Sequence, residues 1–210
     1  MKIKKPITPV LPKLTKTDFI SIDDEVIIEG LSLKDQDLSY QDIRNLVFRE
    51  SRFEKVTMNR NHLERFECSN VIFDHCDLSN TEWIGASFHQ VHFRQCKLTG
   101  TNFAESYLRD CLFEDCLADY TSFSATNQKV VEFKKTSLNN TEFVEVMYNN
   151  LLLDQCSVTG SNWFHTKLAA LDLTTCTFER IAFSQELLKG LKVTQEQAIT
   201  IAAGLGLIIE

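Results

Sequence analysis

Apolar residues recur at every fifth position of the chain from Leu33 to Phe183. Thirty of the 31 positions on this phase are apolar, whereas an apolar content of 43% would place about 13 there. Twelve of the fifteen phenylalanines lie on the same phase, and its single polar member is Gln128. A second phase, two residues before the first, carries Ser, Thr, Ala, Val or Cys at 22 of 31 positions. The residues between the two phases are mostly polar.

A period of five fits neither an α-helix, with a period of 3.6, nor a flat strand, with a period of 2. It fits a short extended piece followed by a turn, so that each repeat forms one side of a coil. Four repeats would close one coil, whose interior is filled by one large and one small side chain per side. Coils stacked at the β-ladder spacing of about 4.8 Å would satisfy one another's backbone groups. The pattern therefore predicts an all-β solenoid of almost eight coils over residues 31–185.

Several segments of this region resemble the pentapeptide-repeat consensus, which is Ala, then Asp or Asn, then a central Leu or Phe, then two variable residues. The resemblance covers about residues 31–185 and implies a right-handed quadrilateral β-helix. The handedness and the square cross-section come from this family, because the five-residue period alone does not determine them. The clearest segments are Cys76-Asp77-Leu78-Ser79-Asn80, Thr101-Asn102-Phe103-Ala104-Glu105 and Ser161-Asn162-Trp163.

The only polar residue on the apolar phase leaves two interpretations open. The phase never slips, so an inserted loop must have a length that is a multiple of five. Residues 125–129, around Gln128, are where such a loop would fit. Alternatively, Gln128 is buried and hydrogen-bonded inside the coil.

The two ends differ from the repeats. Residues 1–16 hold all three prolines and five lysines without an acid, and predict a basic, extended, mobile lead-in. Residues 17–30 are expected to cap the first coil and hide its open edge. Residues 186–210 are expected to be helical, because Thr194 to Gln197 form a capping box and Gly204 ends the following apolar run.

The C-terminal tail is too apolar to be left in water. Its large side chains either seal the last coil or form a two-fold dimer contact, and we favour the dimer because a seal needs fewer of them. The tail also resembles the C-terminal dimerisation segment of Qnr-type pentapeptide proteins. The residues concerned are Ile199, Ile201, Leu205, Leu207 and Ile208.

Charge and composition narrow the function. Residues 17–210 carry 29 acids against 17 bases, which argues against binding of nucleic acid or an anionic membrane. No apolar run is long enough to cross a membrane. The basic N-terminus is followed by no apolar stretch, so we expect no secretory signal and a cytoplasmic location. An odd number of cysteines, seven, favours reduced thiols.

Cysteines and histidines between His75 and Cys96 first suggest a metal site. On the repeat phase, however, six of the seven cysteines occupy the small inward position and all five histidines point outward. Zinc needs four ligands that converge. A filled rod also offers no pocket for a nucleophile with its base. We therefore expect a non-enzyme with no catalytic, cofactor-binding or metal-binding residues.

Acidic residues gather on the side of the coil that is centred on Ile43, Leu63, Trp83, Phe103, Phe123, Phe143 and Trp163. This side carries six acids against Arg44 and Arg65, a net charge of −4. A second concentration wraps the middle of the rod around Arg109. Each group is either a solvated surface without a binding role or a surface that binds a basic partner. The candidate partner-binding residues are Asp42, Glu64, Glu82, Glu105, Glu142 and Glu145 on the first side and Glu105, Asp110, Glu114, Asp115 and Asp119 in the second group.

The resemblance implies a function that the residues alone do not. Qnr and MfpA members of the family are DNA mimics that bind type II topoisomerases and protect them from quinolones. The resemblance therefore implies that this chain, as a homodimer, binds the basic DNA-binding surface of DNA gyrase or topoisomerase IV and modulates the enzyme. Gram-negative Qnr proteins carry projecting loops needed for protection, for which the unbroken phase leaves little room. The alternative is a non-enzymatic interaction or structural scaffold with no topoisomerase role.

Overall fold

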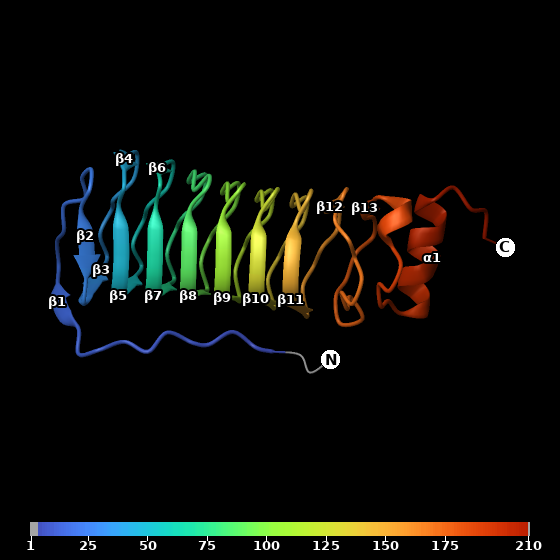
Figure 1. The fold of residues 1–210 in the computed structure, drawn as a ribbon, viewed down its shortest axis with the longest axis horizontal. Coiled ribbons are helices and arrows are strands. Elements are labelled where there is room, and N and C mark those ends of the chain that lie inside the picture. The colour runs from blue at the N-terminus through green and yellow to red at the C-terminus, as the bar shows by residue number, and fades with distance from the viewer. Residues whose placement is uncertain (1–3, 210) are drawn as a thin grey trace.

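Residues 4–209, which the computed structural model describes, form a parallel β-solenoid of about eight coils followed by one α-helix (Figure 1). At the ladder spacing of about 4.8 Å, the coils make a rod about 37 Å long. The predicted solenoid is confirmed. None of the helices in this part of the chain has the length and apolar composition needed to span a bilayer.

Parallel strands stack along the rod with a constant register of one coil, or four repeats. Val47 pairs with Glu67, for example, and Glu67 pairs with Ser87. Nine strands form the main sheet; two further pairs, β4–β6 and β12–β13, lie on a different side of the coil. The main sheet contains β1 (Thr15–Thr17), β2 (Ile27–Glu29), β3 (Leu31–Lys34), β5 (Val47–Glu54), β7 (Glu67–Asp74), β8 (Ser87–Arg94), β9 (Tyr107–Glu114), β10 (Asn127–Lys134) and β11 (Met147–Asp154), and the pairs are β4 (Asp42–Arg44) with β6 (His62–Glu64) and β12 (Asn162–Trp163) with β13 (Ala182–Phe183).

The corners of the coil explain why the period is five. Almost every fifth residue adopts a left-handed backbone, as at Asp35 (φ 55°), Tyr40 (φ 59°) and Asn45 (φ 56°). Most of these residues are not glycine, although the conformation is unfavourable for other residues. Ladder hydrogen bonds hold the corners in place; the amide of Asn45 donates to the carbonyl of Glu64 at 2.9 Å. Each corner turns the chain onto the next of four sides.

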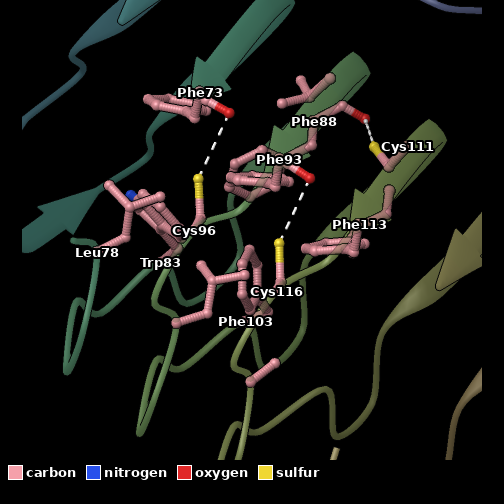
Figure 2. Packing of buried hydrophobic residues seen from close by; sticks show 14 of the residues in the cluster. Phe73, Leu78, Trp83, Phe88, Phe93, Cys96, Phe103, Cys111, Phe113 and Cys116 are labelled. Carbon is pink, nitrogen blue, oxygen red and sulfur yellow. Dashed lines mark hydrogen bonds between the residues drawn. The ribbon is translucent and has the colours of Figure 1, made fainter. Parts of the chain in front are cut away.

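The interior consists of stacked columns of large side chains (Figure 2). Rings in the same column, one coil apart, lie nearly parallel, such as Phe93 and Phe113, whose centroids are 4.7 Å apart. Rings on neighbouring sides meet edge to face, as do Phe103 and Phe113 at 6.0 Å. Both geometries are favourable for aromatic pairs. The core is therefore one continuous cluster along the axis of the rod.

The small inward position also satisfies backbone groups of the preceding coil. The hydroxyl of Thr101 donates to the carbonyl of Leu78 at 2.8 Å. The thiol of Cys96 donates to the carbonyl of Phe73 at 3.4 Å (Figure 2). A small side chain with one donor therefore suits this position. All seven cysteines are buried and free. Burial raises the pKa of the Cys111 thiol to about 12, which makes it unreactive.

Gln128 lies inside the rod, and no loop interrupts the coils around it. Its side chain is 1% exposed, and its amide nitrogen donates to the hydroxyl of Thr126 at 3.0 Å. The strand that contains it, β10, keeps the regular register with β9 and β11. Of the two interpretations, the buried glutamine is correct.

The N-terminal segment differs from the expected mobile lead-in. From β1 it turns back and runs alongside the row of strands as far as β11 (Figure 1). The backbone amide of Ile7 donates to the carboxylate of Asp110 at 3.4 Å, across 103 residues of sequence. Acidic and amide side chains on the rod give the basic segment a place to bind. We call residues 4–14 the arm.

The C-terminus forms the expected helix, α1 (Gln195–Gly204), after a 3₁₀ turn, η1 (Gln185–Leu187). Its capping box is confirmed: the hydroxyl of Thr194 accepts from the amide of Gln197, while the side chain of Gln197 accepts from the amide of Thr194. The helix lies across the end of the rod (Figure 1).

Candidate partner-binding surface

Three of the predicted acids lie in one column on the outside of the rod. Ladder pairing joins Asp42 to His62 and His62 to Glu82, and it reaches Glu142 through residues 102 and 122. Because each step is one coil of about 4.8 Å, Glu82 and Glu142 are about 14 Å apart along the rod. We call the side that carries Asp42, Glu64, Glu82, Glu105, Glu142 and Glu145 the acidic face.

The acids of this face differ in how far they are neutralised. Glu64 is half-buried and forms a salt bridge with Arg44 at 3.0 Å, and Glu82 lies 2.9 Å from the Nδ1 atom of His62. In residues 4–209, by contrast, Asp42, Glu105 and Glu145 are exposed and have no salt bridge. The acidic face therefore keeps a net negative charge that solvent or a partner must neutralise.

Three members of the second predicted group make contacts within the chain itself. Asp110 is 7% exposed beneath the arm, and Glu114 lies between Lys134 at 2.7 Å and His92 at 3.3 Å. The hydrogen bond from Lys134 lowers the pKa of Glu114. Asp119 accepts hydrogen bonds from the hydroxyl of Ser137 and the amide of Asn139. Glu105, at the edge of the acidic face, and Asp115 are the exposed members of this group.

A column of acids and bases that pair with one another occupies another side of the rod. Asp74 is 2% exposed and accepts hydrogen bonds from Arg52, Arg94 and His75. Burial disfavours its ionised form, but the bonds from Arg94 and His75 outweigh this effect and lower its pKa. Lys34 and Glu54 form a similar pair at 2.7 Å. This side neutralises itself and offers little charge to a partner.

The predicted dimerisation residues do not seal the last coil. The exposed fractions are 46% for Ile199, 41% for Leu205, 61% for Leu207 and 92% for Ile208, and Ile201 is half-buried. The tail therefore presents apolar surface beyond the end of the rod.

The buried residue of α1 at the end of the rod is Gln197, which the sequence suggested only as part of the capping box. It is 8% exposed, and its amide nitrogen donates to the carbonyls of Leu173 and Cys176, both at 2.8 Å. These carbonyls would otherwise lie at the open edge of the ladder. The sequence signal that could have identified this role is a polar residue in the first turn of a helix that follows the last coil.

In residues 4–209, no group of three or more His, Cys, Asp or Glu side chains is arranged to hold a metal ion. The five histidines stay on outward positions, and the cysteines are part of the packed core.

Comparison with known proteins agrees with the repeat geometry. The family model named pentapeptide repeat region matches residues 86–163, about four central coils. Residues 86–163 of this chain are therefore similar to a pentapeptide-repeat region. The same five-residue corners and coil-to-coil register extend beyond the matched residues, from β3 to β13.

Several solved structures align with this chain, whereas no curated protein matches its sequence. HetL, a pentapeptide repeat protein involved in heterocyst differentiation regulation in the cyanobacterium Nostoc sp. strain PCC 7120, is 12% identical with a TM-score of 0.41, over 73% of this chain and 78% of HetL. Full-length QnrB1, a plasmid-mediated fluoroquinolone resistance protein, is 15% identical with a TM-score of 0.37, over 91% of this chain and 95% of QnrB1. Rfr23 from the cyanobacterium Cyanothece 51142 is 12% identical with a TM-score of 0.28, over 67% of this chain and 89% of Rfr23.

Proposed function

We propose that this protein is a cytoplasmic DNA mimic that binds the basic DNA-binding surface of a type II topoisomerase, DNA gyrase or topoisomerase IV, and modulates its activity. The observation that carries the proposal is the acidic face. Its exposed carboxylates are fixed on a rigid rod, as phosphates are fixed on a duplex. A protein surface that holds phosphates by charge would find a similar arrangement here.

The spacing of the acidic face supports this comparison. From Asp42 to Glu142 the chain makes five coil steps, or about 24 Å along the rod. Six acids over this length give about one carboxylate per 5 Å, and a DNA strand carries one phosphate per about 3.4 Å. Because hydrogen bonds between the coils fix the backbone of the acidic face, the backbone loses little conformational entropy when a partner binds.

We further propose that two copies associate through the exposed apolar residues of α1 and of the tail that follows it. The exposed side chains of Ile199, Leu205, Leu207 and Ile208 would then be covered by their counterparts, as in an isologous dimer. Two rods joined end to end would present two acidic faces to one symmetric enzyme.

The regular coils bear on quinolone resistance. From β5 to β11, no inserted loop interrupts the coils of the rod. We therefore propose that the protein inhibits the enzyme and that any drug protection is weaker than the inhibition. Assays with and without ciprofloxacin separate the two effects.

The test is a supercoiling assay with purified gyrase at two salt concentrations. Wild-type protein should inhibit at about 50 mM salt and much less at about 200 mM, because exposed charges are screened. The variant Glu105→Lys with Glu145→Lys should inhibit at least tenfold less. Both positions are exposed corners without salt bridges in residues 4–209, and Lys55 and Lys135 already occupy corners of the same kind.

The matched control is Glu179→Lys with Glu186→Lys, which makes the same change in net charge outside the acidic face. It should inhibit like the wild type. No inhibition by the wild type at low salt would refute the topoisomerase role and leave a scaffold as the alternative. Equal losses of inhibition in both variants would show that the net charge of the protein, and not the acidic face, determines inhibition.

A further inference from the structure

The arm lies along one corner of the rod, on the surface that we call the corner groove. This corner groove is formed by two neighbouring columns of outward residues on β9, β10 and β11. The first column contains Asp110, Val130 and Asn150, and the second contains Leu112, Glu132 and Leu152. Outward positions elsewhere in the repeat are mostly exposed or half-buried, but Asp110, Val130 and Glu132 are 7%, 8% and 5% exposed.

Three polar contacts fix the arm in this groove. The backbone amides of Lys4 and Ile7 donate to the side chains of Asn150 and Asp110, each at 3.4 Å. The ammonium group of Lys5 lies 3.7 Å from the carboxylate of Glu132. In residues 4–209 this is the only salt bridge of that nearly buried carboxylate. The groove therefore binds both an extended backbone and a lysine.

The spacing of the contacts matches an extended peptide. Asp110 and Asn150 are two coils apart, about 9.6 Å at the ladder spacing. Ile7 and Lys4 are three residues apart, about 9.3 Å in a polyproline II conformation, which repeats every three residues. The three prolines, Pro6, Pro9 and Pro12, are also three residues apart. Because proline restricts φ, they reduce the entropy lost when the arm is fixed.

Val130 supplies the apolar part of the groove. It occupies a corner with φ 57°, which is unfavourable for a β-branched residue. Its neighbours in the column, Asp110 and Asn150, are of the types that tolerate this backbone better. Such strain persists where other contacts compensate for it, and here the valine is buried between the two polar anchors of the arm.

We propose that the corner groove is a peptide-binding site that recognises an extended segment carrying lysine and regularly spaced proline. Its occupant in the isolated protein is the chain's own arm, which a segment of the same chemistry displaces. The site is independent of the proposed topoisomerase role, because the acidic face lies on another side of the rod.

The first test is amide hydrogen exchange on the full-length protein at low salt. The amides of Lys4 and Ile7 should exchange about tenfold or more slowly than in a free peptide of residues 1–14, because each is hydrogen-bonded to the rod. Exchange at the rate of the free peptide would overturn the proposal.

The second test measures binding of that peptide, labelled with a fluorophore, by anisotropy. In the wild type the tethered arm competes at a high effective concentration, so the peptide should bind weakly. The variant Lys4→Glu with Lys5→Glu should release the arm and bind the unmodified peptide at least about tenfold more tightly. Equal affinities for the wild type and this variant would overturn the proposal.

The groove itself is tested in the released variant. Adding Asp110→Asn and Glu132→Gln should weaken peptide binding at least about tenfold. Adding Glu142→Gln and Glu145→Gln, the same change in charge on the acidic face, should leave it unchanged. Equal weakening by both pairs would show non-specific attraction and overturn the site. Thermal unfolding of each variant establishes that the rod remains folded.

Discussion

Replacing Gln128 with methionine should stabilise the rod, although the glutamine is hydrogen-bonded. Its side chain is buried between Leu108 and Tyr148 of the neighbouring coils. The amide nitrogen donates to Thr126, but the carbonyl oxygen has no hydrogen-bond partner in the described residues. A buried, unsatisfied carbonyl costs about 1–3 kcal/mol, and a neutral hydrogen bond contributes about 1 kcal/mol.

The balance favours the substitution because nothing new is left unsatisfied. The hydroxyl of Thr126 already donates to the carbonyl of Phe123 at 2.7 Å and keeps that bond. Methionine has nearly the length and volume of glutamine, so packing should change little. We expect Gln128→Met to raise the free energy of unfolding by about 1–2 kcal/mol.

Urea denaturation followed by circular dichroism measures this change. With a slope of about 3 kcal/mol per molar urea, the midpoint should rise by about 0.5 M at an unchanged slope. The matched control is Leu108→Gln, one coil earlier in the same column. There Ser106 already donates to Trp83 and accepts from Ala86, so the new amide lacks a ready partner and should cost about 2–4 kcal/mol. A lower midpoint for Gln128→Met would refute the reasoning.

Three further predictions concern other parts of the rod. The pKa of the Asp74 carboxyl is lowered in the folded protein, so its contribution to stability is complete above the unfolded pKa of about 3.9 and is lost as the pH falls through the lower folded pKa. Asp74→Asn should therefore lower the free energy of unfolding by about 2 kcal/mol at pH 7. A loss that persists unchanged below pH 3 would contradict this. The indole N–H of Trp163 donates to the hydroxyl of Ser161 at 2.9 Å, whereas the indole N–H of Trp83 has no partner in the described residues. In urea denaturation, Trp163→Phe should therefore cost about 1 kcal/mol more stability than Trp83→Phe. Equal costs would exclude this account. If the tail forms the dimer, Ile199→Asp with Leu205→Asp should halve the mass found by light scattering, and an unchanged mass would be evidence against the contact.

The rod could be predicted from the sequence because its order is local and periodic. Each inward position recurs after five residues, so Phe93 and Phe113 are identified by counting alone. Counting also placed Cys96 inside, and the structure confirms it. The alignment of the charged residues 54, 74, 94 and 114 in one column likewise follows from the coil-to-coil register.

The rest depends on contacts that have no period. The arm binds Asp110 across 103 residues, and no spacing in the sequence connects the two segments. The capping role of Gln197 depends on where α1 crosses the open coil, which the helix signals do not specify. The sequence also ranked the acids around Arg109 with the acidic face, because charge alone does not distinguish an exposed carboxylate from one used within the rod.

The constant register of four repeats per coil limits how such a rod can change in length during evolution. Inserting or deleting a whole coil moves all later residues along the axis and leaves each of them on its own side. Gaining or losing a single repeat also preserves the buried core, but it rotates everything beyond that point by one side. Carboxylates that had been aligned would then be divided between two directions. Selection for a binding surface along the rod should therefore favour length changes by whole coils, while selection for folding alone would permit changes by single repeats.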